Sequence, residues 1–557
     1  MRLTWAQPED LLGHEVRQAA EDGRDPGPAQ RAWSAAGGHP APERAGASPA
    51  PAPPHLRALA ARLLDELARL PSPLAADEPT AWADIVAACP TADSPEPATP
   101  LPAGTEPLTR LRRAEAGPAR EAHPTISPGP VAHVPAEEHR PGPVTHTAAA
   151  SGTAAAADAD RQQSARAHAR TGPDPGPEPS GPVPGAGPGA RHAASGRAPL
   201  APPPGDALRE RLEAAWVGRA VGCLLGKPVE KLPLEGIRAL ARATGNWPLG
   251  DWFTARGVPP ELLAAHPWNR RSAPTSLAEN IDGMPEDDDL NYPLLGLLLL
   301  QRHGRSFTTA DVARLWLDEL PAGRTFTAER VAYRNLLLGL EPPATATHHN
   351  PFREWIGALI RADVHGWTNP GDPAAAAAQA YRDAALTHTG NGVYAALFVA
   401  AATAEAATGR TDVHTALRTG LAAVPPRSRL AEAIRFGVRT ATDEADFDLV
   451  VDRLHARYGH YHWVHAVPNT ALIAAALTHA DGDFTRSVCR AVSGGWDTDS
   501  NGATAGALAG LLTGSPDRIP HRWTAPLKNR LATSIPGFDG IGFDTLAHLT
   551  AQEAARS

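Results

Sequence analysis

The sequence predicts an all-α protein, and three observations support this prediction. Several segments carry apolar residues at helical spacing, whereas the alternating β-branched and aromatic runs typical of strands are nearly absent. Glycine and proline fall between the helical segments more often than inside them. Residues 206–557 are therefore expected to form one compact multi-helix domain, long enough to bury a core.

The first part of the chain, residues 1–95, is expected to be a short helical region. The stretch WAQPEDLLGHEVRQAAEDG at 5–23 is typical of an amphipathic helix, and PPHLRALAARLLDELARL at 53–70 repeats leucine at helical spacing. Such a region suits a tether, a partner-binding arm or a regulatory segment, and the sequence does not choose among them.

Residues 96–205 are expected to form a disordered linker. This segment is rich in proline, alanine and glycine, as in TGPDPGPEPSGPVPGAGPGARHAASG, and no periodic apolar face runs through it. A compact proline-rich domain is the alternative.

Within the main domain, helical periodicity recurs from one end to the other. The predicted helical segments are 206–227, 308–321, 372–388, 393–409 and 468–480. The most apolar run, PLLGLLLL at 293–300, is too short to span a bilayer and has charged residues on both sides.

Composition and charge exclude several classes of function. The 557 residues carry a formal net charge of −9, which gives no direct nucleic-acid signature and does not favour a membrane surface. Cys89, Cys223 and Cys489 are widely separated, which argues against a disulfide framework or a zinc site. The start, MRLTWAQPEDLLGHEV, has acidic residues where a secretory signal needs an apolar stretch. We expect a cytoplasmic protein.

A first acidic segment lies at 285–289, within PEDDDLNYPLLGLLLL. Pro285 suits the first turn of a helix, and the four carboxylates that follow it would face the positive helix end. A cluster that only satisfies the helix dipole is the alternative. Four adjacent carboxylates repel one another, however, and the apolar run after them predicts that this helix end points into a buried region, where such charges need a cation.

A second acidic segment lies at 497–500, within SGGWDTDSNGATAGALAG. Asp497 and Asp499 are two positions apart, so in an extended or turn segment they point the same way, and Ser500 adds a hydroxyl. The small residues that follow would let a helix pack with its backbone close to a neighbour. The alternative is a turn that caps this helix, with Asp499 or Ser500 at the N-cap.

Together, the two acidic segments indicate a metal site built from hard oxygen ligands. Carboxylates and a hydroxyl suit Mg²⁺, Mn²⁺ or Ca²⁺ rather than Zn²⁺, and they could hold one or two ions. The histidines in HHN at 348–350 and GHYHWVH at 459–465 leave a transition-metal site as an alternative.

These motifs resemble those of the ADP-ribosylglycohydrolase family, over about 210–545. VGRAVGCLLGKPVE is similar to the family's opening motif G-D-A-L-G-x-P-x-E. PEDDDLNYPLLGL is similar to its T-D-D-T motif, and GGWDTDSNGATAGALAG to its G-D-T-D-[TS] motif. AALTHTG at 384–390 resembles a Thr-His segment, and WIGALIRAD at 355–363 a Gly-rich phosphate-binding loop.

The resemblance implies an all-helical fold with two Mg²⁺ or Mn²⁺ ions in a cleft, and hydrolysis of the glycosidic bond between ADP-ribose and a modified protein side chain or small molecule. Asp288 would orient or deprotonate the attacking water, and Glu230 would lie near the ribose. Gly357 would offer backbone N–H groups to the diphosphate, and His388 would line the cleft. The implied metal ligands are Glu286, Asp287, Asp288, Asp497, Asp499 and Ser500.

The sequence also departs from the family pattern. Cys223 stands where many members have aspartate, Glu286 and Asp289 replace threonines, and Trp496 precedes the second acidic segment, where it would either wall the cleft or fill the core. The leading hypothesis is a Mg²⁺-dependent hydrolase that releases ADP-ribose. The alternatives are a non-catalytic ADP-ribose or nucleotide sensor and a metal-dependent nucleotide phosphohydrolase.

Overall fold

The computed structural model describes residues 5–41, 51–89 and 205–556. These residues form α-helices and short 3₁₀-helices without any strand, and only isolated bridges join extended residues. The all-α prediction is confirmed for the described part of the chain. Apart from Gly205, the predicted linker at 96–205 lies outside the described residues, so this boundary stays a prediction.

Four helices precede the gap at 90–204. They are α1 (Pro8–Glu21), α2 (Gly27–Ala35), α3 (Pro54–Ala68) and α4 (Trp82–Ala88). The helices expected at 5–23 and 53–70 correspond to α1 and α3. These helices belong to the same compact unit as residues 205–556.

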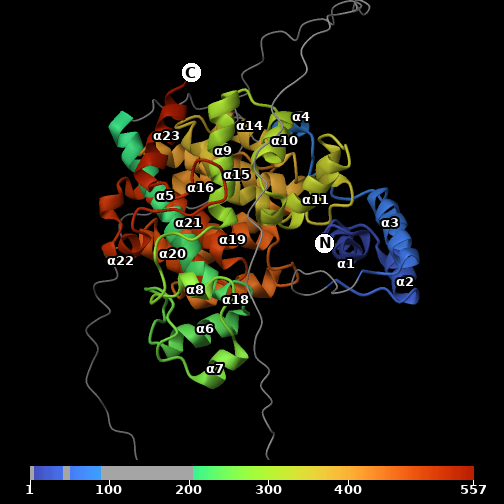
Figure 1. The fold of residues 1–557 in the computed structure, drawn as a ribbon, viewed down its shortest axis with the longest axis horizontal. Helices are drawn as coiled ribbons and strands as arrows, with labels where there is room; N and C mark the ends of the chain where they lie inside the picture. The colour runs from blue at the N-terminus through green and yellow to red at the C-terminus, as the bar shows by residue number, and fades with distance from the viewer. Residues whose placement is uncertain (1–4, 42–50, 90–204, 557) are drawn as a thin grey trace, which may run out of the picture. The chain divides into compact units, whose positions relative to one another are not determined.

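The helices of the main domain follow from Gly205 (Figure 1). The principal ones are α5 (Gly205–Gly226), α6 (Leu234–Ala243), α9 (Asp288–His303), α10 (Thr309–Glu319), α11 (Thr327–Leu337), α14 (Pro373–Ala384), α15 (Gly390–Ala407), α16 (Val413–Ala422), α17 (Arg429–Asp443), α18 (Phe447–Tyr458), α19 (Ala466–Ala480), α20 (Phe484–Ser493), α21 (Thr498–Thr513) and α23 (Phe543–Ala555). The shorter ones are α7 (Pro260–Ala265), α8 (Ala273–Ser276), α12 (Ala344–Thr347), α13 (Asp363–Trp367), α22 (His521–Thr524), η2 (Lys227–Val229), η3 (Ala322–Arg324), η4 (Ile356–Arg361), η5 (Pro516–Arg518) and η6 (Ala525–Leu527).

Glycines bring α5 and α21 into backbone contact, and Figure 1 shows the two helices side by side. A Cβ on Gly222 would lie 1.8 Å from the carbonyl oxygen of Gly502, and a Cβ on Gly218 would lie 2.2 Å from that of Gly506. No larger side chain fits at such distances. The small-residue run after the second acidic segment therefore allows the close approach that the sequence predicted, and its partner is α5.

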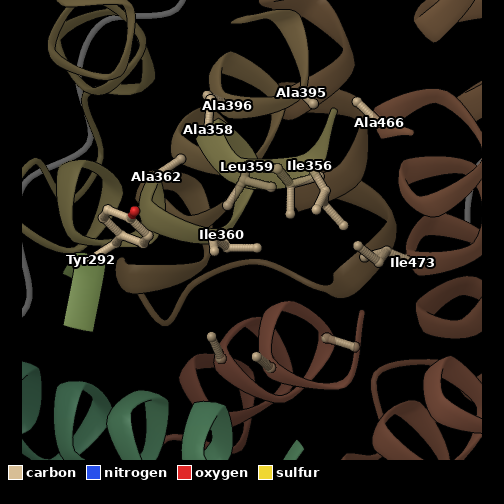
Figure 2. Close-up of a cluster of buried hydrophobic side chains, with 14 of the residues drawn as sticks. Tyr292, Ile356, Ala358, Leu359, Ile360, Ala362, Ala395, Ala396, Ala466 and Ile473 are labelled. Carbon is tan, nitrogen blue, oxygen red and sulfur yellow. The ribbon is translucent and has the colours of Figure 1, made fainter. Parts of the chain in front are cut away.

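The alanine-rich helices α15 and α19 lie in the core. Every residue of α15 is buried, and so is every residue of α19 except His479. In Figure 2, Ile356, Leu359 and Ile360 of η4 belong to a buried cluster with Tyr292 of α9 and Ile473 of α19. Packing in this hydrophobic cluster fixes the position of η4, one of the segments predicted to bind a ligand.

The first acidic segment enters its helix later than expected. Helix α9 begins at Asp288, so Pro285 lies before it and not in its first turn. Two hydrogen bonds hold Met284 extended: its N–H donates to Arg530 O at 2.8 Å, and its carbonyl accepts from Ala532 N at 2.9 Å. Asp287 then takes the N-cap position, where its Oδ1 accepts from Asp289 N at 2.9 Å.

In the described part of the chain, no helix is both long and apolar enough to cross a membrane. Helix α9 contains the PLLGLLLL run, and its leucines are largely buried within the domain. The cytoplasmic location stays a prediction. Cys89, Cys223 and Cys489 form no disulfide, as their spacing indicated.

Candidate active site

One cavity of about 400 Å³ brings the two acidic segments together. Further walls come from η2 and the loop after it, from the start of α11 and from η4. All the site residues predicted from the sequence line this cavity except His388; they are Glu230, Glu286, Asp287, Asp288, Gly357, Asp497, Asp499 and Ser500.

Asn469 of α19 fixes the start of α21. The N–H of Asp497 donates to Asn469 Oδ1 at 3.1 Å, and Nδ2 of Asn501 donates to the same oxygen at 2.7 Å. Asp497 holds the N-cap position, but its side chain makes no capping hydrogen bond. Asp499 and Ser500, which the alternative interpretation placed at the N-cap, lie inside the first turn instead. The carboxylates of this segment are therefore not used to cap the helix.

Glu230, Asp497 and Asp499 form a cluster of carboxylates. Each offers one oxygen, and the three oxygens lie within 4.8 Å of one another. Glu230 is held in place from its other side, because Asn269 Nδ2 donates to its Oε2 at 2.6 Å and Lys231 Nζ pairs with its Oε1 at 2.6 Å. Oxygen donors at this spacing fit a hard cation such as Mg²⁺, Mn²⁺ or Ca²⁺.

The electrostatics of this cluster agree with its donor chemistry. Burial, together with the neighbouring charges of Glu230 and Asp287, raises the pKa of Asp499 to about 7. Burial also raises the pKa of Asp497, which lies against Asp499, well above its ordinary value. The carboxylates thus repel one another in a largely buried part of the cavity wall. A divalent cation between them would offset that repulsion.

Lys227 compensates part of the first acidic segment. Its Nζ forms an ion pair with Asp287 Oδ2. Burial acts to raise the pKa of Asp287, but the charge and hydrogen bond of Lys227 outweigh it, so the pKa is lowered. The same charge interaction raises the pKa of Lys227 against the effect of its burial. Asp287 is therefore a carboxylate that stays ionised without a metal.

A second group of ligand atoms includes a cysteine that the sequence spacing did not indicate. Cys223, Asp287 and Asp289 each offer one atom within 4.8 Å of the other two. Burial raises the pKa of the Cys223 thiol, and the two nearby aspartates raise it further. The Cys223 thiol donates a hydrogen bond to Asp289 Oδ2, with 3.9 Å between Sγ and the oxygen. A protonated thiol in this position packs against the cluster and is a poor metal ligand.

Glu286 and Asp288 line the same cavity but differ in their ion-pair partners. Glu286 Oε2 pairs with Arg324 Nη2 at 2.8 Å, and its Oε1 accepts from Ser534 N at 3.1 Å. Asp288 has no ion-pair partner among the described residues. Burial raises the pKa of Asp288 well above its ordinary value, and the charges of Asp287 and Asp289 add to this rise. Of the two carboxylates, Asp288 is thus better suited to bind a ligand or to accept a proton.

Arg219 joins three of the segments beneath the cavity. Its Nε donates to the carbonyl oxygen of Asp289 at 2.6 Å, and its Nη1 pairs with Asp363 Oδ2 at 2.5 Å. Its Nη2 donates to the carbonyl of Ile360 in η4 and lies 3.3 Å from Asp289 Oδ1. Asp289 Oδ2 in turn accepts from the hydroxyl of Ser500 at 3.3 Å. The Arg219 guanidinium therefore fixes the positions of α5, the first acidic segment and η4 relative to one another.

Gly357 is required by its contact with Glu329 of α11. A Cβ at this position would lie 2.0 Å from Glu329 Oε1. The same carboxylate oxygen pairs with Arg361 Nη1 at 2.8 Å, and that nitrogen also donates to the carbonyl of Gly357 at 2.9 Å. Arg361 is buried, and its Nε pairs with Asp383 at 2.9 Å. The η4 turn is therefore held rigidly at the cavity wall.

The structure does not bring His388 to the cavity, where the resemblance placed it. Its side chain is buried, its Nδ1 lies 2.6 Å from Thr387 Oγ1, and its Nε2 lies 3.9 Å from Glu329 Oε1. Burial lowers the pKa of His388 well below its ordinary value, and the nearby positive charge of Arg361 lowers it further. A neutral His388 therefore lies behind Glu329, and it is Glu329 that lines the cavity.

The structure also answers two questions that the sequence left open. Trp496 does not line the cavity; it is buried and stacks on His455 with ring centroids 3.9 Å apart, so it fills the core. The histidines at 348–350 and 459–465 join no cluster of metal-ligand atoms within the described ranges. His462, for example, stacks on Trp355 with ring centroids 4.2 Å apart.

Sequence reasoning missed several residues that shape the site. Arg219 is the one charged residue within AAWVGRAVGCLLG at 214–226, a signal that a buried partner must exist. Lys227 stands inside the glycine–proline motif, where its charge was a comparable signal. Nothing local indicated Glu329 or Asn269, because their roles depend on chain segments that are distant in sequence.

A sequence profile of the family described as ADP-ribosylglycohydrolase matches residues 204–554. A solved structure titled "ADP-ribosylglycohydrolase-related protein complex" shares 22% sequence identity with this chain; the match covers 63% of this chain and 98% of that one, with a TM-score of 0.38. No curated protein matches the chain.

Proposed function

Because the chain belongs to the ADP-ribosylglycohydrolase family, we propose that it hydrolyses the glycosidic bond of an ADP-ribosylated protein or small molecule and releases ADP-ribose in a Mg²⁺-dependent reaction. The observation that carries this proposal is the cavity in which the two acidic segments meet, with the oxygens of Glu230, Asp497 and Asp499 within 4.8 Å of one another.

The residues present fit a pair of hard divalent ions, Mg²⁺ or Mn²⁺. Glu286 is the least suited of the proposed ligands, since Arg324 and Ser534 already engage its two oxygens. Glu230 adds a carboxylate next to Asp497 and Asp499. We assign metal binding to Glu286, Asp287, Asp288, Asp497, Asp499 and Ser500.

When bound, such ions polarise substrate oxygens and lower the pKa of water. The protein's own groups then complete the reaction. Asp288, whose carboxylate lacks an ion-pair partner among the described residues, orients the attacking water or takes its proton. Glu230 lies near the ribose, where positive charge develops in an oxocarbenium-like transition state. Gly357 presents backbone N–H groups of η4 to the diphosphate.

The proposal is tested by an ADP-ribose release assay on a panel of modified acceptors, with Mg²⁺, with Mn²⁺ and with EDTA. The full chain should release ADP-ribose from at least one acceptor, and EDTA should abolish release. Asp497→Asn should lower the rate by about 100-fold or more, since it removes one charged oxygen from the cluster. Asp318→Asn, at an exposed position of α10, is the matched control and should keep full activity.

The other hypotheses give different results in the same assay. A sensor binds ADP-ribose tightly and releases none from any acceptor. A nucleotide phosphohydrolase releases inorganic phosphate. Either result would overturn the proposed activity, and so would full activity of Asp497→Asn.

A further inference from the structure

The N-terminal helical region reaches into the cavity through Trp5. This residue lines the cavity together with Phe326 of α11 and with Trp355 and Ile356 at the start of η4. Trp5 lies outside residues 204–554, the range that matches the family. We propose that Trp5 is a specificity-determining wall of the site, against which the planar base of a nucleotide ligand packs. This inference rests on the proposed function for the nature of the ligand.

Trp5 is held in position by the backbone that follows it and by a neighbouring aromatic ring. Its backbone φ is +68°, a left-handed conformation that a bulky residue adopts only when its surroundings hold it there. The next residue, Ala6, is buried, and its carbonyl accepts from Arg334 Nη1 of α11 at 2.6 Å. The Trp5 ring lies 6.5 Å from the ring of Phe352, centroid to centroid. The indole is therefore part of the cavity wall.

Helix α1 and the residue that follows it, Asp22, hold this wall through partly buried ion pairs. Glu15 Oε2 pairs with Arg353 Nη1 at 2.7 Å, and Asp22 Oδ2 pairs with Arg353 Nη2 at 2.8 Å. Gln18 Nε2 donates to Glu354 Oε2 at 2.9 Å. Arg353 and Glu354 directly precede Trp355. Helix α1 therefore contacts the segment at 353–355 that leads into the cavity.

An aromatic cluster continues the same contact. His14 of α1 lies 5.0 Å from the ring of Phe352 and 5.7 Å from that of Trp355, centroid to centroid, both edge-on. Trp355 therefore has α1 on one side and the cavity on the other. The N-terminal region both supplies Trp5 and supports the second tryptophan of the wall.

The chemistry of the cavity suits a ligand with a charged part and a flat part. Carboxylates and cations such as Lys231 and Arg271 provide for sugar hydroxyls, metal ions and phosphate. Trp5, Phe326 and Trp355 add aromatic surface, and aromatic side chains bind the faces of nucleotide bases by stacking. A ligand without a base would make no use of Trp5.

The test compares ADP-ribose with ribose 5-phosphate, which keeps a ribose and a phosphate but lacks the adenosine monophosphate half and therefore the base. Affinities for ADP-ribose and for ribose 5-phosphate are measured by calorimetry on the full chain, with Mg²⁺ present. Trp5→Ala should weaken ADP-ribose binding about tenfold, the usual effect of losing one stacked aromatic ring, and should leave ribose 5-phosphate binding within about twofold. Trp5→Phe should restore most of the ADP-ribose affinity.

Trp82→Ala is the matched control. Trp82 lies in α4 of the same N-terminal region, is half-buried like Trp5, and packs against Tyr381 with ring centroids 5.0 Å apart, but it does not line the cavity. Its loss should leave both affinities unchanged. Equal weakening of both ligands by Trp5→Ala, or no weakening of ADP-ribose, would overturn the inference. A wild-type chain that binds no ADP-ribose would overturn the proposed function as well.

Discussion

At the scale of the residue, the Arg219 side chain is fully buried and forms ion pairs with both Asp289 and Asp363. Arg219→Met would fill most of the volume and leave both carboxylates buried without their cation. Breaking a buried ion pair in this way costs about 3–5 kcal/mol. We expect this loss in the free energy of unfolding, measured by urea denaturation with circular dichroism.

Two further variants separate charge from geometry at this position. Arg219→Lys keeps the charge, but its single nitrogen cannot reach the partners that Nε, Nη1 and Nη2 of the guanidinium contact at different places, so it should recover only part of the stability. Arg209→Met, at an exposed position of the same helix, should change the free energy of unfolding very little. If Arg219→Met were as stable as Arg209→Met, the assigned role of Arg219 would be wrong.

Residue by residue, the sequence predicts which side chains gather at one cavity better than how each side chain is oriented. Asp497 and Asp499 could be identified because adjacent carboxylates next to apolar helices need a reason to be buried. The orientation of His388 could not be predicted. Its ring turns toward Thr387 and Glu329, and that choice depends on how α11 packs against η4. Likewise, the sequence placed Trp496 beside the site but could not show that it stacks on His455.

At the scale of the element, the crossing of α5 and α21 sets the distance between Glu230 and the second acidic segment. Gly222→Ala would place a methyl group 1.8 Å from the carbonyl oxygen of Gly502, so the helices must separate. Overpacking of this kind costs about 1–3 kcal/mol or more. We expect a lower melting temperature and weaker Mg²⁺ binding, measured by calorimetry.

The same helix supplies the control for this prediction. A Cβ on Gly205, the first residue of α5, would meet no atom within 4 Å. Gly205→Ala should therefore leave both stability and Mg²⁺ binding close to those of the wild type. A Gly222→Ala variant with wild-type Mg²⁺ affinity would show that the crossing does not set the metal site.

Element boundaries were less predictable than element types. The helical spacing at 206–227 and 393–409 matches α5 and α15 closely, because long periodic segments carry a strong signal. Pro285 was expected in the first turn of α9, but Met284 bonds to the chain around Arg530 and delays the helix to Asp288. That contact joins residues far apart in sequence, so no local pattern could reveal it.

At the scale of the whole molecule, the N-terminal helical region and the main domain share charged contacts. Arg429 Nη2 of α17, for example, pairs with Glu78 at 2.7 Å and with Glu354 at 2.9 Å. The sequence left a tether, a partner-binding arm and a regulatory segment open. The contacts of α1 favour a region that is built into the site, and each of them links positions too distant for sequence patterns to pair.

This attachment should depend on pH through His14. Burial among Phe352, Trp355 and His462, together with the charge of Arg17, lowers the pKa of His14 from 6.5 to about 3. Between pH 6.5 and about 3, the unfolded chain binds a proton on His14 and the folded chain does not. The stabilising effect is therefore complete above pH 6.5 and is lost as the pH falls, by up to about 1.4 kcal/mol per pH unit.

His14→Phe removes this proton and keeps an aromatic ring in the cluster. As the pH falls from 6.5, the wild type should lose stability relative to His14→Phe, and its α1 amides should exchange hydrogen faster than those of the variant. Urea unfolding and hydrogen exchange at several pH values between 6.5 and about 4.5 measure both effects. His548→Phe, at an exposed position of α23, controls for the loss of a histidine. Parallel pH profiles for the wild type and His14→Phe would mean that His14 has the same pKa in the folded and the unfolded chain. In that case α1 would not shield His14 behind Trp355.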